Sequence, residues 1–211
     1  MNLVTPTSLK KAATHLATSD PVLEPIINKA GLASITPHDN YYWELIDSII
    51  SQQLSVKAAS TIEKRFRDLF DEDIPTPEQI LSKSIDELRS AGLSGQKAKY
   101  IQDLAGHIKS GKVSFDKITG QSNEEIITEL TDVKGIGEWT AHMFLIFSVG
   151  RLDILPTGDL GIRNGVRKLY GFSDMPTPEQ IRDVAVANNW HPYESVASWY
   201  VWHSLDNAPK T

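Results

Sequence analysis

The fold of this chain is decided by the stretch Val133-Lys134-Gly135-Ile136-Gly137-Glu138-Trp139-Thr140. Its two glycines lie one residue apart between two helical patterns, where the backbone can approach a partner that a side chain would block. The N–H groups at the start of the following helix then face outward, where the helix dipole favours an anion such as phosphate. The stretch therefore predicts a tight corner between two helices that binds phosphate through its backbone.

We call residues 131–137 the hairpin. The simplest interpretation of such a corner is that one glycine ends a helix and the next one starts another. Val133 and Ile136 alternate with the glycines, however, and can anchor the turn inward while its amides point outward. Contacts made through the backbone would bind DNA without reading its sequence. The residues expected to contact DNA here are Lys134, Gly135, Ile136 and Gly137.

The composition predicts no required cofactor. The chain has no cysteine, which excludes disulfides, thiolate zinc sites and iron–sulfur clusters, and its six histidines show no ligand spacing. A metal held by side chains is therefore not expected. The main-chain carbonyls of Thr131, Val133 and Gly135 are instead candidate ligands of a structural monovalent cation, which would bridge to the phosphate.

Length and hydropathy indicate a soluble globular protein. Of the 211 residues, 40% are hydrophobic and 23% are charged, which is enough for one compact domain or two small lobes. No apolar run approaches the roughly 18 residues that span a membrane, so no membrane partner is expected. The segment from Met1 to Lys11 lacks the apolar core of a signal peptide. We expect a cytoplasmic, nucleoid-associated protein, or a nuclear one if its source is a eukaryote.

The net charge of −6 argues against a protein that coats nucleic acid through bulk electrostatics. Basic residues are nevertheless clustered, and a short phosphate footprint on an acidic body predicts a modest dependence of binding on salt. One cluster contains Lys57, Lys64, Arg65 and Arg67, and the other contains Arg151, Arg163, Arg167 and Lys168.

Almost the whole chain shows helical periodicity, and no stretch alternates as a strand would, which predicts an all-α fold. Capping boxes begin at Thr76, Ser84 and Ser122, and Gly92, Gly111 and Gly171 are stop signals. The motif Pro-Thr-Pro-Glu-Gln-Ile occurs at 75–80 and again at 176–181, as two uses of the same helix start. The predicted helical segments are Leu9–Leu16, Trp43–Leu54, Ala58–Phe70, Lys97–Ile108, Glu124–Leu130, Trp139–Val149, Leu160–Tyr170 and Val196–Leu205.

Asp159 is the candidate catalytic residue. It precedes the helical pattern of residues 160–170, so its simplest interpretation is an N-cap. The two roles are compatible, because a carboxylate at a helix N-terminus stays ionised and can stabilise a developing cation. Cleavage of an N-glycosidic bond generates an oxocarbenium-like sugar. Asp159 can stabilise that charge and orient a water molecule for attack on the sugar carbon.

Only this one acidic residue stands out, which suffices if the leaving base already carries a positive charge. Trp139, Trp199, Tyr200 and Trp202 would then supply ring faces, and a cationic base over a tryptophan gains roughly 0.5–2 kcal/mol. The alternative is that residues 199–202 pack in the core through their helix, and we expect this for at least one of them.

Two adjacent glutamines lie in Ile49-Ile50-Ser51-Gln52-Gln53-Leu54-Ser55. The simplest interpretation is a solvated turn after an apolar helix. The alternative is a wedge, since extraction of a base from a duplex costs a few kcal/mol and the hole must be filled. Gln53 and Leu54 can fill it, with Gln53 contacting the orphaned base. We call residues 52–55 the wedge loop, and we expect Gln52, Gln53, Leu54 and Ser55 to contact DNA.

These motifs together resemble the helix-hairpin-helix DNA glycosylases, and among them the 3-methyladenine DNA glycosylase II, or alkylbase glycosylase, branch. The resemblance runs roughly from Tyr42 to Trp202. Several ordered motifs with matched spacing make it specific. They are the wedge-loop stretch 49–55, Gly-Leu-Ser-Gly-Gln-Lys-Ala at 92–98, the hairpin stretch 133–141, Asp-Ile-Leu-Pro-Thr-Gly-Asp-Leu-Gly at 153–161 and Ser-Val-Ala-Ser-Trp-Tyr-Val-Trp at 195–202.

The resemblance implies a single glycosylase domain over residues 1–211, made of two helical lobes with the active-site cleft between them and without an N-terminal β domain. Asp159 matches the family's catalytic aspartate. Trp139 and Trp202 match its base-pocket tryptophans, and Gln53 and Leu54 match its intercalating loop. DNA would lie across the cleft with the target nucleotide flipped into it.

Three positions refine this expectation. Relatives with lyase activity carry a lysine where Trp139 stands, so the resemblance implies a monofunctional enzyme that leaves an abasic site. Met143 occupies a pocket position that can be aromatic, which implies weaker stacking or altered specificity. Glu194 stands where an arginine is common, which puts a local ion pair in doubt.

The expected function is a monofunctional DNA glycosylase of base-excision repair that hydrolyses alkylated purines, such as 3-methyladenine and 7-methylguanine, from duplex DNA. The expected partner is double-stranded DNA with a damaged base, bound by a monomer. One alternative is a non-excising binder of damaged or abasic DNA, in which Asp159 is only a helix cap. A glycosylase with β-lyase activity is a third reading, disfavoured by Trp139.

Overall fold

The computed structural model describes residues 3–70, 72 and 74–205. Within these residues the regular structure is helical, and the only β-pairing is an isolated antiparallel bridge between Leu3 and Arg151. The all-α prediction is therefore confirmed. In the same part of the chain, no helix combines the length and hydropathy needed to cross a lipid bilayer.

The chain divides into two compact units. We call residues 39–141 the central unit, and residues 1–38 together with 142–211 the terminal unit. Each unit is held by its own core, because apolar side chains spaced three and four residues apart face inward along its helices.

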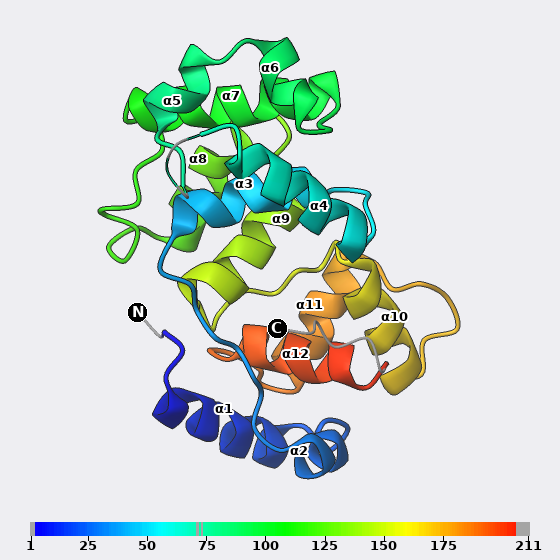
Figure 1. Ribbon diagram of the computed structural model, residues 1–211. Coiled ribbons are helices and arrows are strands. Elements are labelled where there is room, and N and C mark those ends of the chain that lie inside the picture. The colour runs from blue at the N-terminus through cyan, green and yellow to red at the C-terminus, as the bar shows by residue number, and fades with distance from the viewer. Residues whose placement is uncertain (1–2, 71, 73, 206–211) are drawn as a thin grey trace. The chain divides into compact units, whose positions relative to one another are not determined.

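The central unit is built around α7 (Gly95–Lys109), which buries Ala98, Ile101, Leu104 and Ala105 on one face. The short helices α5 (Pro77–Ser82) and α6 (Ile85–Ser90) lie beside it, as Figure 1 shows. Helix α3 (Tyr41–Ser51) contacts both α7 and α4 (Val56–Arg67). Helix α8 (Asn123–Thr131) leads into the hairpin, and α9 (Glu138–Met143) follows it.

The terminal unit surrounds α12 (Glu194–His203), in which every residue from Ser195 to Trp202 is buried. A helix that is buried all round must be covered by several neighbours. Helices α1 (Pro6–Ser19), α2 (Glu24–Ala30) and α10 (Leu160–Leu169) all contact it. The unit also contains a π-helical segment, η1 (Phe144–Val149), and α11 (Pro178–Ala187).

The helix starts predicted from capping boxes are confirmed. Thr76, Ser84 and Ser122 each accept a hydrogen bond from the backbone N–H three residues on, and each of those residues returns a side-chain bond. Thr177 caps α11 in the same way as Thr76 caps α5. The repeated motif is therefore a repeated cap, with proline at the first helical position.

The predicted helical segments differ from the structure in several places. The pattern over 43–54 ends as helix at Ser51, because Gln53 turns to the left-handed region with φ of 58°. The pattern over 139–149 divides into α9 and the π-helical segment, which apolar spacing alone does not distinguish. Helix α2 was not predicted, since its seven residues are too short to show a period.

A buried carboxylate organises the interior of the terminal unit. Asp20 is fully buried and accepts hydrogen bonds from the backbone N–H of Val22 at 2.9 Å and of Leu23 at 3.1 Å. It also accepts from the Trp190 indole at 2.7 Å and from the Tyr170 hydroxyl. Burial, followed by this hydrogen bond, raises the pKa of Tyr170, so that the phenol stays a donor. The start of α2 is thus bonded to residues that lie 150 and more positions later.

Candidate active site

Asp159 caps α10, as predicted. Its Oδ1 accepts the backbone N–H of Ile162 at 2.8 Å, and its carbonyl accepts the N–H of Arg163 at 2.9 Å. A turn places Asp159 at the start of the helix, since its N–H donates to the carbonyl of Pro156 at 3.0 Å. The carboxylate is half-buried at the N-terminal end of this ten-residue helix, where the helix dipole favours negative charge.

Trp202 gives the carboxylate a second fixed donor. Its indole Nε1 donates to the same Oδ1 of Asp159 at 2.8 Å. The ring is only 5% exposed, and its centroid lies 5.9 Å from that of Phe147 at an interplanar angle of 32°. Two N–H donors on one oxygen set the position of the carboxylate. An oriented anion therefore lies beside a pair of aromatic rings within the terminal unit.

Glycines on α10 make this contact sterically possible. A Cβ at Gly161 would lie 2.9 Å from Cδ1 and 3.0 Å from Nε1 of Trp202. A Cβ at Gly165, one turn later, would lie 2.3 Å from Cγ1 of Val201. Both distances are shorter than van der Waals contact allows. The two glycines therefore let α10 approach α12 closely enough for Trp202 to reach Asp159.

The remaining aromatic candidates separate into core and surface. Trp199 is 5% exposed and stacks on His203, and Tyr200 is fully buried and donates its hydroxyl to the carbonyl of Gly31 at 2.8 Å. The core interpretation is confirmed for these two. Trp139 is 53% exposed in the central unit, and Met143 is half-buried in the terminal unit. The base pocket that would combine Trp139, Met143 and Trp202 stays a prediction.

The hairpin is anchored as its sequence indicates. Val133 and Ile136 are 1% and 4% exposed. Gly135 has a φ of 89°, and a Cβ there would lie 2.1 Å from Cδ2 of Tyr100. Gly137 faces open space, and its carbonyl accepts the N–H of Ala141 at 3.0 Å at the start of α9. Only glycine suits position 135, because both its backbone and its neighbour exclude a side chain.

Among residues 134–137 of the hairpin, two amides do not point outward, which corrects the prediction for them. The N–H of Lys134 donates to Oδ2 of Asp103 at 2.9 Å, and the N–H of Ile136 donates to the carbonyl of Val133 at 3.1 Å. Asp103 lies on α7 and was not identified as a site residue. The ammonium of Lys134 is exposed and lies 3.5 Å from Oδ1 of Asp103. Lys134 therefore offers its side chain to a ligand while its amide is bonded internally.

The carbonyls proposed for a cation are partly engaged. Val133 accepts the Ile136 N–H, and the oxygen of Gly135 accepts Nε2 of Gln52 at 2.8 Å. Among residues 3–70, 72 and 74–205, no group of three or more histidine, cysteine, aspartate or glutamate side chains is arranged to hold a metal ion.

The wedge loop divides into an inward and an outward part. The side chain of Gln52 reaches the hairpin, whereas Gln53, Leu54 and Ser55 are exposed, with Leu54 at 38%. The Ser55 hydroxyl accepts the N–H of Ala58 at 3.4 Å and caps α4. The exposure suits both a solvated turn and a wedge. The side chain of Gln52 bonds to the hairpin, and its contact with DNA stays a prediction.

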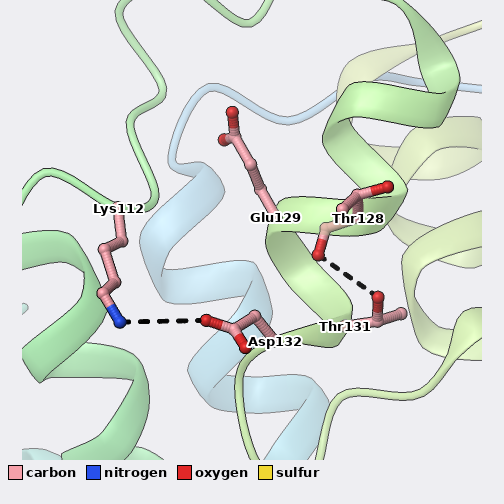
Figure 2. Close-up of a pocket in the computed structure, with 5 residues that line it drawn as sticks. All are labelled: Lys112, Thr128, Glu129, Thr131 and Asp132. Carbon is pink, nitrogen blue, oxygen red and sulfur yellow. Dashed lines mark hydrogen bonds and ion pairs between the residues drawn. The ribbon is translucent and has the colours of Figure 1, made fainter.

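An open hollow of about 490 Å³ adjoins the hairpin, and Figure 2 shows its lining. The ammonium of Lys112 lies 4.0 Å from a carboxylate oxygen of Asp132, and the Thr131 hydroxyl donates to the Thr128 carbonyl at 3.3 Å. Glu129 adds a second carboxylate to the wall. Two carboxylates against one ammonium disfavour a phosphate, so the hollow does not extend the anion site.

Sequence reasoning missed several residues that shape the site. Gly161 stood in a quoted motif, yet its role depends on a ring 41 positions later. Phe147 lies in the π-helical segment and was assigned to no site. Lys97 and Tyr100 of α7 contact the wedge loop and the hairpin. At Glu194, a carboxylate oxygen lies 3.0 Å from Nδ1 of His191, so this departure has a local partner.

Comparisons with known proteins identify the family and several relatives of this chain. Residues 46–188 match the family described as HhH-GPD superfamily base excision DNA repair protein. DNA-3-methyladenine glycosylase 1 of Schizosaccharomyces pombe is 36% identical over 212 residues, covering 97% of this chain and 91% of the relative. The crystal structure of the DNA-3-methyladenine glycosidase from Bacillus halodurans has a TM-score of 0.83 at 36% identity, covering 97% of this chain and 92% of that one. The S. pombe 3-methyladenine DNA glycosylase in complex with abasic DNA has a TM-score of 0.79 at 34% identity, covering 95% and 99%.

We expect Gly161→Ala to displace the Trp202 indole from Asp159, because the new methyl group would overlap the ring. The overpacking should lower the free energy of unfolding by about 1–3 kcal/mol in urea denaturation. The indole N–H resonance of Trp202 should shift in a ¹H–¹⁵N spectrum. Gly158→Ala is the matched control, since a Cβ there meets nothing within 4 Å. An unchanged Trp202 resonance in Gly161→Ala would contradict the steric account.

Proposed function

We propose a function from the premise that this chain belongs to the HhH-GPD superfamily of base excision DNA repair proteins. The protein is a DNA glycosylase that hydrolyses the N-glycosidic bond of alkylated purines, of the 3-methyladenine and 7-methylguanine type, in duplex DNA. The names of its relatives support this activity. The observation in the chain that carries it is a carboxylate, Asp159, held by two N–H donors beside the aromatic rings of Trp202 and Phe147.

The chemistry needs one carboxylate and no general acid. Alkylation at N3 or N7 makes the base cationic, so it leaves as a neutral molecule when the bond to C1′ breaks and its electron pair goes to the base. The deoxyribose is left as an oxocarbenium ion, which the carboxylate of Asp159 stabilises. A water oxygen then bonds to C1′ and its proton passes to Asp159 or to solvent. The products are the free base and an abasic site.

In this proposal, the hairpin and the wedge loop of the central unit bind DNA. In the central unit, the exposed ammonium of Lys134 and the backbone around Gly137 bind a phosphate, and Leu54 with Gln53 fills the space of the flipped nucleotide. The complex of the S. pombe relative with abasic DNA supports DNA as the partner. We propose that the protein binds DNA as a monomer.

Asp159→Asn should retain the fold and lose base release. Asparagine caps helices as well as aspartate does, so α10 keeps its start, while the stabilising charge is gone. We expect release of 7-methylguanine from an alkylated duplex to fall about 100-fold or more, measured by chromatography of the freed base.

Asp174→Asn, at an exposed carboxylate of the same unit, is the control and should release base at the wild-type rate. Equal release by Asp159→Asn and wild type would reduce Asp159 to the helix cap seen in the structure. Binding of alkylated duplex by a wild-type protein that releases no base from any lesion would instead support the non-excising binder.

We further propose that the enzyme is monofunctional, because Trp139 stands where lyase relatives carry a lysine. No amine is then supplied at that position to form a Schiff base with the sugar. Borohydride added during the reaction should trap no covalent protein–DNA adduct, and strand cleavage should appear only after alkali. A trapped adduct that requires borohydride would assign the chain to the lyases.

A monovalent cation on the carbonyls of Thr131, Val133 and Gly135 is a finer proposal. Each carbonyl oxygen has two lone pairs, so Val133 and Gly135 can each accept a hydrogen bond and still ligate a cation. Such an ion would reinforce the phosphate contact and take no part in bond cleavage. Replacement of Na⁺ and K⁺ by tetramethylammonium at equal ionic strength should weaken binding to abasic duplex several-fold. Unchanged affinity would remove the ion from the site.

A further inference from the structure

The wedge loop is held in a conformation that it would not adopt alone. Gln53 has a φ of 58°, which is uncommon for a residue other than glycine. Such a conformation persists only where the surroundings fix it. The N–H of Leu54 donates to the Ser51 carbonyl at 3.1 Å, and Ser55 is committed as the cap of α4. Both ends of the loop are thus tied to helices.

Lys97 of α7 holds the start of the wedge loop through hydrogen bonds. Its Nζ donates to the carbonyls of Ile50 and Gln52, each at 2.7 Å. These carbonyls lie at the C-terminal end of α3, where the helix offers no partner and carries partial negative charge. Lys97 is half-buried, and its burial lowers the pKa of its ammonium. Two charge-assisted hydrogen bonds therefore fix the point at which the loop leaves the helix.

Gln52 links the loop to the hairpin. Its side-chain amide donates to the Gly135 carbonyl, 83 positions later, at 2.8 Å. Gly135 in turn lies against the ring of Tyr100, which leaves no room for a side chain. A polar hollow of about 290 Å³ lies among Gln52, Lys97, Tyr100 and Gly135.

The three residues of α7 that contact the wedge loop and the hairpin lie on one face of the helix. Lys97, Tyr100 and Asp103 follow one another at intervals of three residues, so they lie on the same side of the helix. Lys97 contacts the wedge loop, Tyr100 contacts Gly135, and Asp103 accepts the amide of Lys134. The loop that would enter the duplex and the turn that would bind the phosphate thus share one rigid base.

We propose that Lys97 and Gln52 are positioning residues that fix the wedge loop to the hairpin, so that phosphate binding and base displacement act as one preorganised device. The inference rests on the proposed function. A loop ordered in advance incurs no ordering cost when the base is displaced. Neither residue contacts DNA in this proposal, because the ammonium of Lys97 donates to two carbonyls and the side-chain amide of Gln52 donates to the Gly135 carbonyl.

The test compares Lys97→Met with Lys99→Met, a change at an exposed lysine of the same helix. Excision is measured under single turnover from a duplex with 7-methylguanine opposite cytosine, and from one with the lesion opposite a tetrahydrofuran abasic analogue. In the second duplex the lesion has no pairing partner, so its displacement needs less help from the wedge. We expect Lys97→Met to lose about tenfold or more on the first and less than about threefold on the second. Lys99→Met should match wild type, and Lys97→Arg should restore most of the activity.

Two further measurements separate this role from its rivals. Were Lys97 a phosphate contact, Lys97→Met would reduce the salt slope of DNA binding by about one; we expect an unchanged slope. Gln52→Ala, which keeps the lysine, should show the same preference for the unpaired lesion if Lys97→Met does not fold. Equal losses on both duplexes, or a reduced salt slope, would overturn the proposal.

A readout that needs no base release keeps the inference distinct from the proposed function. 2-Aminopurine placed opposite the abasic analogue reports insertion of the wedge by its fluorescence at saturating protein. Wild type and Lys99→Met should give the full change, and Lys97→Met and Gln52→Ala a smaller one. Wild type that inserts the wedge without excising any lesion would end the glycosylase assignment and leave the positioning role standing. An equal signal from all four proteins would end the positioning role.

Discussion

The hydrogen bond from the Trp202 indole to Asp159 depends on close contact between two helices of the terminal unit. Gly161 and Gly165 remove the side chains that would separate α10 from α12, and the Trp202 indole is buried at this contact. Asp159 then receives one donor from its own helix and one from its neighbour. The same packing that closes the core therefore also orients the candidate catalytic group, so that stability and chemistry are coupled at this contact.

In the central unit, one helix likewise serves both the core and the candidate DNA-binding residues. Helix α7 contributes Leu104 and its apolar neighbours to the core on one face, and Lys97, Tyr100 and Asp103 to the loop and hairpin on another. The hairpin is consequently more than a pair of glycines between helices. Its geometry is set by contacts with residues some thirty positions earlier, which hold Gly135 and the amide of Lys134 in place.

Local signals allowed much of the fold to be predicted. Capping chemistry at Thr76 and Thr177, and the burial of Val133 and Ile136, are properties of short segments and appear as expected. Contacts between distant segments were beyond the same reasoning. Periodicity shows which face of a helix is apolar, but not which residue of another helix meets it. The amide of Lys134 was therefore expected at the surface, although Asp103 accepts it.

The sequence allowed the residues of the site to be predicted more fully than their arrangement in space. The resemblance pointed to Asp159 and Trp202, and the structure joins them, whereas Gln52 turned out to bond the hairpin. The spacing of a motif records which residues take part, but the direction of each side chain depends on neighbours that the motif does not contain. Gln52 and Gln53 illustrate this, because Gln52 bonds to the Gly135 carbonyl whereas the adjacent and chemically identical Gln53 is exposed.

The pairing of Lys134 with Asp103 has a consequence for how this protein finds its target. The carboxylate lies 3.5 Å from the ammonium and cancels much of its field beyond a few ångströms, on a body whose net charge is already −6. Long-range electrostatic attraction of the protein to DNA is therefore weak, and binding relies on short-range contacts. Binding would then depend on how well the hairpin and the wedge loop fit the DNA backbone, and contacts with undamaged duplex would be short-lived.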